Sequence, residues 1–110
     1  MKHLPYRATT TTTTGAVLDI QFPLHAQTVS AVTVSQLLDS VLLTLSRDIA
    51  LLPNVGNGDV LQALAMALAV RAGIVHAPFD FMAAQTRALL VTALDAVGEG
   101  ESSAPAAGHA

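Results

Sequence analysis

The sequence has no cysteine, no tryptophan and few charged residues. Without cysteine, the chain can form neither disulfides nor thiolate metal sites, and a reducing compartment is permitted. Aromatic residues make up 4% and charged residues 12% of the 110 residues. Lysine and glutamate are both missing between Ala16 and Val97. A chain so short of large and charged side chains has limited means to build a heavy core or to solvate its whole surface alone.

Charge and hydropathy argue against two classes of partner. The net charge of −3 and the pI near 5.6 argue against nucleic acid and against anionic membrane surfaces. No stretch reaches the roughly 18 apolar residues of a membrane span, because the run Val60–Val70 is bounded by Asp59 and Arg71. The N-terminus lacks the continuous apolar region of a signal peptide. These features predict a cytoplasmic protein without a membrane span.

The most distinctive stretch is Asp59–Val75, which is long enough for four helical turns and apolar almost all the way round. Between Val60 and Val70 the only polar residue is Gln62. A helix of this kind cannot lie on a solvated surface, so its own chain or another copy must cover it on several sides. The sequence therefore predicts that this helix is buried and that Leu64 and Leu68 belong to the core.

Three segments show helical periodicity and are bounded by helix-breaking residues. The predicted helices span residues 34–52, 58–74 and 78–97. Pro53 ends the first helix, Gly73 and Pro78 bracket the end of the second, and Gly98 ends the third.

Two pairs of residues have the spacing of a capping box at the helix starts. Thr33 precedes Gln36 by three residues, which predicts that the first helix begins at Thr33 or just after it. Asp59 and Gln62 have the same spacing, and Asn57 is an alternative cap for the second helix.

One segment, residues 16–22, has the period-two alternation of a half-buried strand. Leu18, Ile20 and Phe22 alternate with polar residues, and Pro23 ends the strand or confines it to a sheet edge. A single strand is unstable, and the sequence indicates no convincing partner strand. The segment is therefore expected to pair with its copy in another subunit or to lie extended across the helices.

The two ends of the chain have no apolar periodicity. Residues 1–15 end in a run of threonines, and residues 98–110 are small and polar, so both are predicted to be flexible. The predicted fold is mainly α, with a three-helix domain over residues 16–97. Its N-terminal part is an extended segment or a single β-strand, and oligomerisation is expected to complete it.

Motifs of catalysis, metal binding or cofactor binding are not evident in the sequence. The histidines His3, His25, His76 and His109 are scattered, and none has a second ligand at helical spacing. His76 precedes Asp80 by four residues, but a loop histidine beside a helix-capping aspartate is the simpler interpretation. We expect no catalytic, cofactor or metal site, and hence no enzyme.

Each predicted helix carries one arginine: Arg47, Arg71 and Arg87. Aspartates are numerous enough to pair with all of them, which is the simplest expectation. Arg71 is the exception of interest, because its helix is otherwise so apolar that a buried guanidinium would need a partner. It is a weak candidate for binding an anionic ligand.

These features favour a small non-enzymatic protein–protein interaction module that self-associates, most simply as a homodimer. Another protein is an alternative partner. The expected interface residues are Leu18, Ile20, Phe22, Leu43, Leu51, Leu64 and Leu68. The first alternative is a binder of small molecules or acyl ligands, with a cavity between the second and third helices. The second alternative is a small DNA-binding regulator, although the second helix exposes few residues suited to reading bases.

Overall fold

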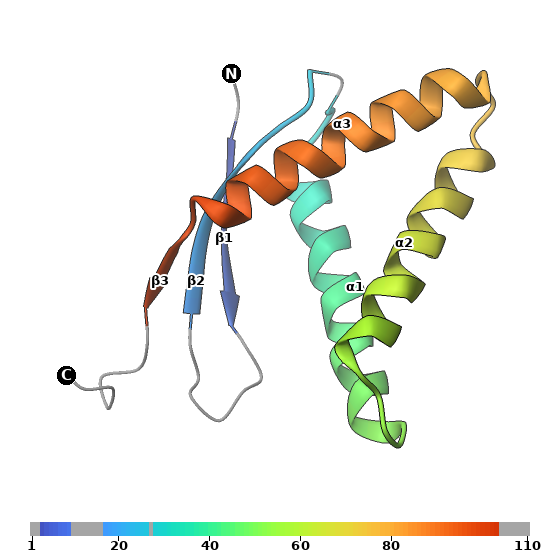
Figure 1. Ribbon diagram of the computed structural model, residues 1–110. Coiled ribbons are helices and arrows are strands. Elements are labelled where there is room, and N and C mark those ends of the chain that lie inside the picture. Colours follow the sequence, from blue (N-terminus) through green and yellow to red (C-terminus); the bar gives the residue numbers. More distant parts are fainter. Residues whose placement is uncertain (1–2, 10–16, 27, 104–110) are drawn as a thin grey trace. The chain divides into compact units, whose positions relative to one another are not determined.

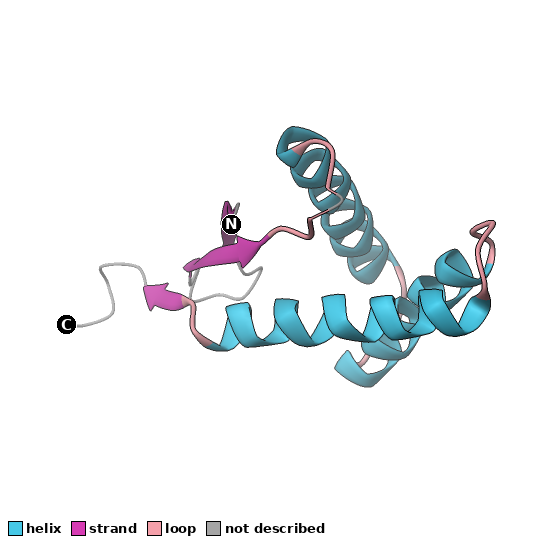
Figure 2. Cartoon of the chain, turned by 90° about the horizontal axis from the view of Figure 1, so that it is seen from above, coloured by secondary structure: helices cyan, strands magenta, loops and turns pink. Residues whose placement is uncertain are grey.

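A computed structural model describes residues 3–9, 17–26 and 28–103 of the chain. The elements are β1 (His3–Thr9), β2 (Val17–Pro23), α1 (Ala31–Leu51), α2 (Asn57–Gly73), α3 (Phe79–Gly98) and β3 (Glu101–Ser103), as Figures 1 and 2 show. The fold is mainly α with an extended N-terminal segment, as predicted, and each helix boundary lies within three residues of its predicted position. The predicted flexible segments at 10–15 and 104–110 lie outside the described residues.

The strands form an antiparallel sheet in the order β1-β2-β3. Tyr6 lies opposite Ile20, and Leu4 lies opposite Phe22, so the apolar residues of both strands share one face. The rings of Tyr6 and Phe22 are diagonal neighbours with centroids 6.3 Å apart. Leu4 and Ile20 are buried by this arrangement.

The prediction that β2 lacks a partner in its own chain is wrong. β1 pairs along the whole of β2, and β3 pairs with its first residues, Val17 to Asp19. Residues 3–9 are therefore a strand and not a loose leader, and residues 101–103 are a strand within the predicted tail. With β2 in the centre of the sheet, its ladder hydrogen bonds over Val17–Asp19 are made on both edges, which leaves no room there for a copy of itself.

The helices begin at caps that differ slightly from those predicted. The hydroxyl of Ser30, and not that of Thr33, caps α1, since it accepts a hydrogen bond from the Thr33 amide at 3.2 Å. At α2, Gly56 is the N-cap, and its amide donates to the Asp59 carboxylate at 3.0 Å. Asp59 thus supplies the carboxylate of a capping interaction, although its partner is Gly56 and not Gln62.

The chain divides into two compact units. The first unit contains the sheet with the start of α1 and the end of α3, up to Leu38 and from Val91. The second unit is Asp39–Leu90, with α2 and the adjoining parts of α1 and α3. Within the described residues, close approach over several residues occurs only between strands, β1 with β2 and β2 with β3.

The buried apolar side chains of the described residues are few and small. They are Leu4, Ile20 and Ala96 in the first unit and Ala72 in the second. The chain by itself does not cover α2 on several sides, since Leu68 is 41% exposed and Leu64 is only partly buried. Cover by another copy, the other possibility that the sequence left open, stays a prediction. No helix of the described residues has the length and hydropathy that crossing a membrane would require.

Candidate functional site

Two hollows stand out in the described residues, one in each compact unit. The first unit holds a polar hollow of about 700 Å³ at the junction of the sheet with the end of α3. The second unit holds a smaller groove of about 240 Å³, which runs between α2 and the start of α3.

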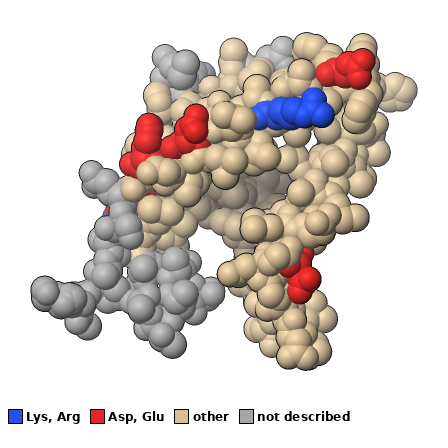
Figure 3. Space-filling view, in the orientation of Figure 1, with Lys and Arg blue, Asp and Glu red and all other residues tan. Residues whose placement is uncertain are grey.

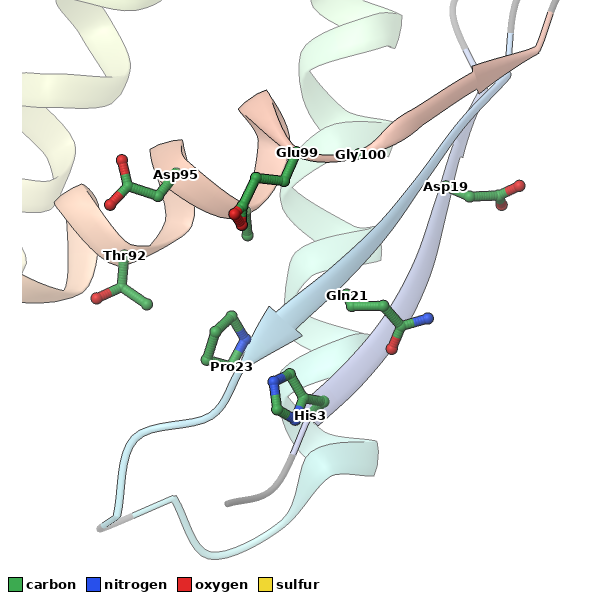
Figure 4. A pocket seen from close by; sticks show the side chains of 9 residues that line it. His3, Asp19, Gln21, Pro23, Thr92, Asp95, Glu99 and Gly100 are labelled. Atoms are coloured by element: carbon green, nitrogen blue, oxygen red, sulfur yellow. The ribbon is translucent and has the colours of Figure 1, made fainter.

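The polar hollow collects side chains from three elements, as Figure 4 shows. His3 comes from β1, Gln21 from β2 and Asp95 from α3, and Glu99 directly follows α3. The carboxylate of Asp19 points away from those of Asp95 and Glu99. The hollow therefore does not gather its carboxylates at one point.

Asp19 already has a partner on β1. The Nε of Arg7 donates a hydrogen bond to Asp19 Oδ1 at 2.8 Å, and Nη2 lies 3.5 Å from Oδ2. This hydrogen bond, and then the charge of Asp19, raise the pKa of the Arg7 guanidinium above its ordinary value. The pair is structural in character, because it joins directly opposed residues of two neighbouring strands.

The described residues contain no cluster of three or more histidine, cysteine, aspartate or glutamate side chains that could hold a metal ion. His76 lies in the loop before α3 and Asp80 lies in the first turn of that helix. In the part of the chain that the structure describes, neither side chain makes a hydrogen bond or an ion pair. His109 lies outside the described residues.

The α2–α3 groove is lined mainly by alanine and larger apolar side chains, and its one charged residue is Arg87. Among the lining residues are Ala65, Leu68 and Ala72 of α2 and Phe79 and Leu90 of α3. The alanines leave low ridges, which explains how a groove can open between two helices that are otherwise rich in leucine and valine.

In the described residues, the three helical arginines do not pair with aspartates, although the sequence led us to expect such pairs. Over the described ranges 3–9, 17–26 and 28–103, Arg47, Arg71 and Arg87 make no ion pair. They also do not converge on one site, since Arg87 lines the groove whereas Arg71, the candidate for an anionic ligand, lies outside it and is exposed.

The most extensive feature of the surface is apolar. Large hydrophobic side chains of all three helices are exposed, and the face in Figure 3 is formed mostly by uncharged residues. The most exposed on the helices include Leu37, Leu43, Leu51, Leu61, Val70 and Phe79, each at 63% or more. Apolar surface of this extent commonly marks an interaction site.

The predicted interface residues are distributed unevenly over this surface. Leu43 is 64% and Leu51 80% exposed, and Leu68 is 41% exposed. Leu64, Leu18 and Phe22 are partly buried. Ile20 is buried within the chain, at 4% exposure.

Sequence reasoning missed two features of these sites. The strand β1 carries a period-two signal of its own, since Leu4, Tyr6 and Ala8 alternate with Pro5, Arg7 and Thr9. The lining of the groove by Arg87 and its neighbours is not visible in the sequence, because it depends on how α2 and α3 are placed beside each other. Comparison of the chain with protein-family models, with curated proteins and with solved structures found no match.

Proposed function

We propose that the protein is a self-associating interaction module whose helices bury their apolar faces against a second copy of the chain. The observation that carries the proposal is the exposure of large apolar side chains on all three helices, while the buried core of the described residues is limited to Leu4, Ile20, Ala72 and Ala96. Four small or medium side chains contribute little hydrophobic stabilisation on the scale that a domain requires.

A second copy is the simplest cover for the exposed apolar side chains of the helices, because a two-fold interface lets the same faces cover each other.

Replacing exposed leucines by aspartate tests the proposal. Leu68→Asp and Leu52→Asp should each raise the dissociation constant of the dimer by about tenfold or more, because a charge would be desolvated at the interface. Ser46→Asp is the matched control, since it adds the same charge at an exposed polar position of α1. Sedimentation equilibrium measures the constants, and circular dichroism checks that the helices persist. Leucine variants that dissociate no more readily than the control would contradict the proposal.

A second function, the binding of an apolar ligand with a carboxylate, is favoured by the α2–α3 groove with Arg87 beside it. Small-molecule sites usually measure about 300–1,000 Å³, and this groove is smaller and open, at about 240 Å³. The test is a thermal shift with medium-chain fatty acids, because a ligand that binds only the folded state raises Tm. We regard this function as secondary to self-association.

A further inference from the structure

The residues that line the α2–α3 groove limit the kind of group that can occupy it. Arg87 lines the groove together with Ala83 and Leu90, which lie four residues before it and three residues after it on the same face of α3. Within the described residues Arg87 has no carboxylate partner. A purely apolar occupant would remove water from the Arg87 guanidinium without supplying a hydrogen-bond acceptor or an opposite charge, which is unfavourable. The occupant must therefore combine apolar side chains with an acidic group.

Helix α1 carries that combination on one face. Val41, Leu45 and Asp48 of α1, with Leu52 directly after the helix, recur at the i, i+4, i+7 and i+11 spacing that aligns side chains along a helix. Asp48 thus lies within an apolar row and not on the polar side of α1. It is exposed and, like Arg87, makes no ion pair in the part of the chain that the structure describes.

The groove and the α1 row are complementary in shape and in charge. The groove is concave, floored by alanines and bears one cation, whereas the row is apolar and bears one anion. The residues that line the groove come from α2 and α3, so α1 of the same chain does not fill it.

We propose that the α2–α3 groove receives the Val41–Leu52 face of a second copy, with the partner's Asp48 beside Arg87. This inference rests on the proposed self-association and specifies its contact surface. In a two-fold dimer each copy offers one groove and one row, so the contact is made twice.

Charge exchange at the two positions tests the pairing. Asp48→Arg and Arg87→Asp should each weaken the dimer by about tenfold or more, because each brings like charges together in both contacts. The double variant, Asp48→Arg with Arg87→Asp, should return the dissociation constant to within about threefold of the wild type. Ser46→Arg on the opposite side of α1 and Arg71→Asp outside the groove make the same charge changes and should leave the constant unchanged.

The absence of cysteine permits an independent test by cross-linking. One preparation carries Leu45→Cys and a second, isotopically labelled, carries Ala83→Cys, each one turn from the charged residue of its row. The mixture, oxidised mildly, should give a disulfide between labelled and unlabelled chains. Failure of this cross-link together with unchanged constants in both single charge variants would overturn the groove contact.

The outcomes separate this inference from the function on which it rests. A dimer that persists in all the charge variants would leave self-association intact and place its contact elsewhere. A wild type that is monomeric at every concentration would contradict both proposals. If decanoate raises the Tm of the wild type but not that of Arg87→Asp, while the single charge variants dimerise normally, the groove is a ligand site and the docking of α1 is wrong.

Discussion

The Arg7 guanidinium and the Asp19 carboxylate lie directly opposite each other in the β1–β2 pair, with 2.8 Å between Nε and Oδ1. Both side chains are well exposed, at 71% and 44%, so water screens their attraction. The importance of the pair is in the register of the strands. A slip of one residue would move Ile20 from the buried face of the sheet to the other face, and would separate the two charges.

Exchanging the charges of Arg7 and Asp19 tests whether the pair fixes the register of β1 and β2 or only adds attraction between the strands. Arg7→Asp alone places two carboxylates opposite each other and should lower the Tm of the sheet, because like charges are unfavourable at directly opposed positions. Adding Asp19→Arg should recover most of the loss. Fluorescence of Tyr6, the one tyrosine of a chain without tryptophan, follows the melting of β1. A double variant no more stable than Arg7→Asp would show that the pair does not set the register.

Ile20 is the most deeply buried of the described apolar side chains, at 4% exposure. Its replacement by alanine should lower the free energy of unfolding of the sheet by about 2–5 kcal/mol, and Ile20→Val by about 0.5–1.5 kcal/mol. Urea titrations followed by Tyr6 fluorescence measure both losses. Equal losses from the two variants would mean that the methyl groups of Ile20 are not packed as the structure shows.

Removal of residues 1–9 should destabilise the protein, although the sequence predicted a flexible leader there. β1 supplies the buried Leu4 and the strand that pairs along all of β2. Ending the chain after Ser103 is the control, since every described element is retained. Thermal melts by circular dichroism should show a lower Tm for the first truncation only. A first truncation as stable as the control would exclude a structural role for β1.

Gly100 lies where the chain passes from α3 to β3 and has little space around it. A Cβ placed there would lie 2.9 Å from the carbonyl oxygen of Asp19 and 3.2 Å from Leu18 Cδ1. Gly100→Ala should therefore weaken the pairing of β3 with β2, by roughly 1–3 kcal/mol if the backbone has to shift. Gly98→Ala is the matched control, because nothing lies within 4 Å of its Cβ position. Hydrogen exchange of the Asp19 backbone amide measures this pairing. Protection of that amide that is lost in Gly100→Ala and kept in Gly98→Ala would support this account.

The helices were predictable because their signals are local. Pro53, Pro78 and Gly98 end or bound helical periodicity whatever the rest of the chain does, and the boundaries followed within three residues. The caps were less certain, since Ser30, Thr33 and Asp59 are all good N-cap residues and the backbone decides among them.

The sheet was predictable in part. The alternation of Leu18, Ile20 and Phe22 identified β2, but Pro5 and the adjoining threonine run obscured the same alternation in β1. β3 has no apolar pattern. Its pairing with β2 therefore depends on where α3 ends. The groove depends on how α2 and α3 are placed beside each other, which periodicity within either helix does not determine.

The central claim is that a second copy covers the exposed apolar faces of the helices. Light scattering coupled to gel filtration, at micromolar concentration and moderate salt, tests it most directly. We predict a single species with twice the 11.3 kDa mass of the chain, which dissociates on dilution with its helices retained or unfolds as it dissociates. A folded monomer of 11.3 kDa across the whole concentration range would contradict the claim.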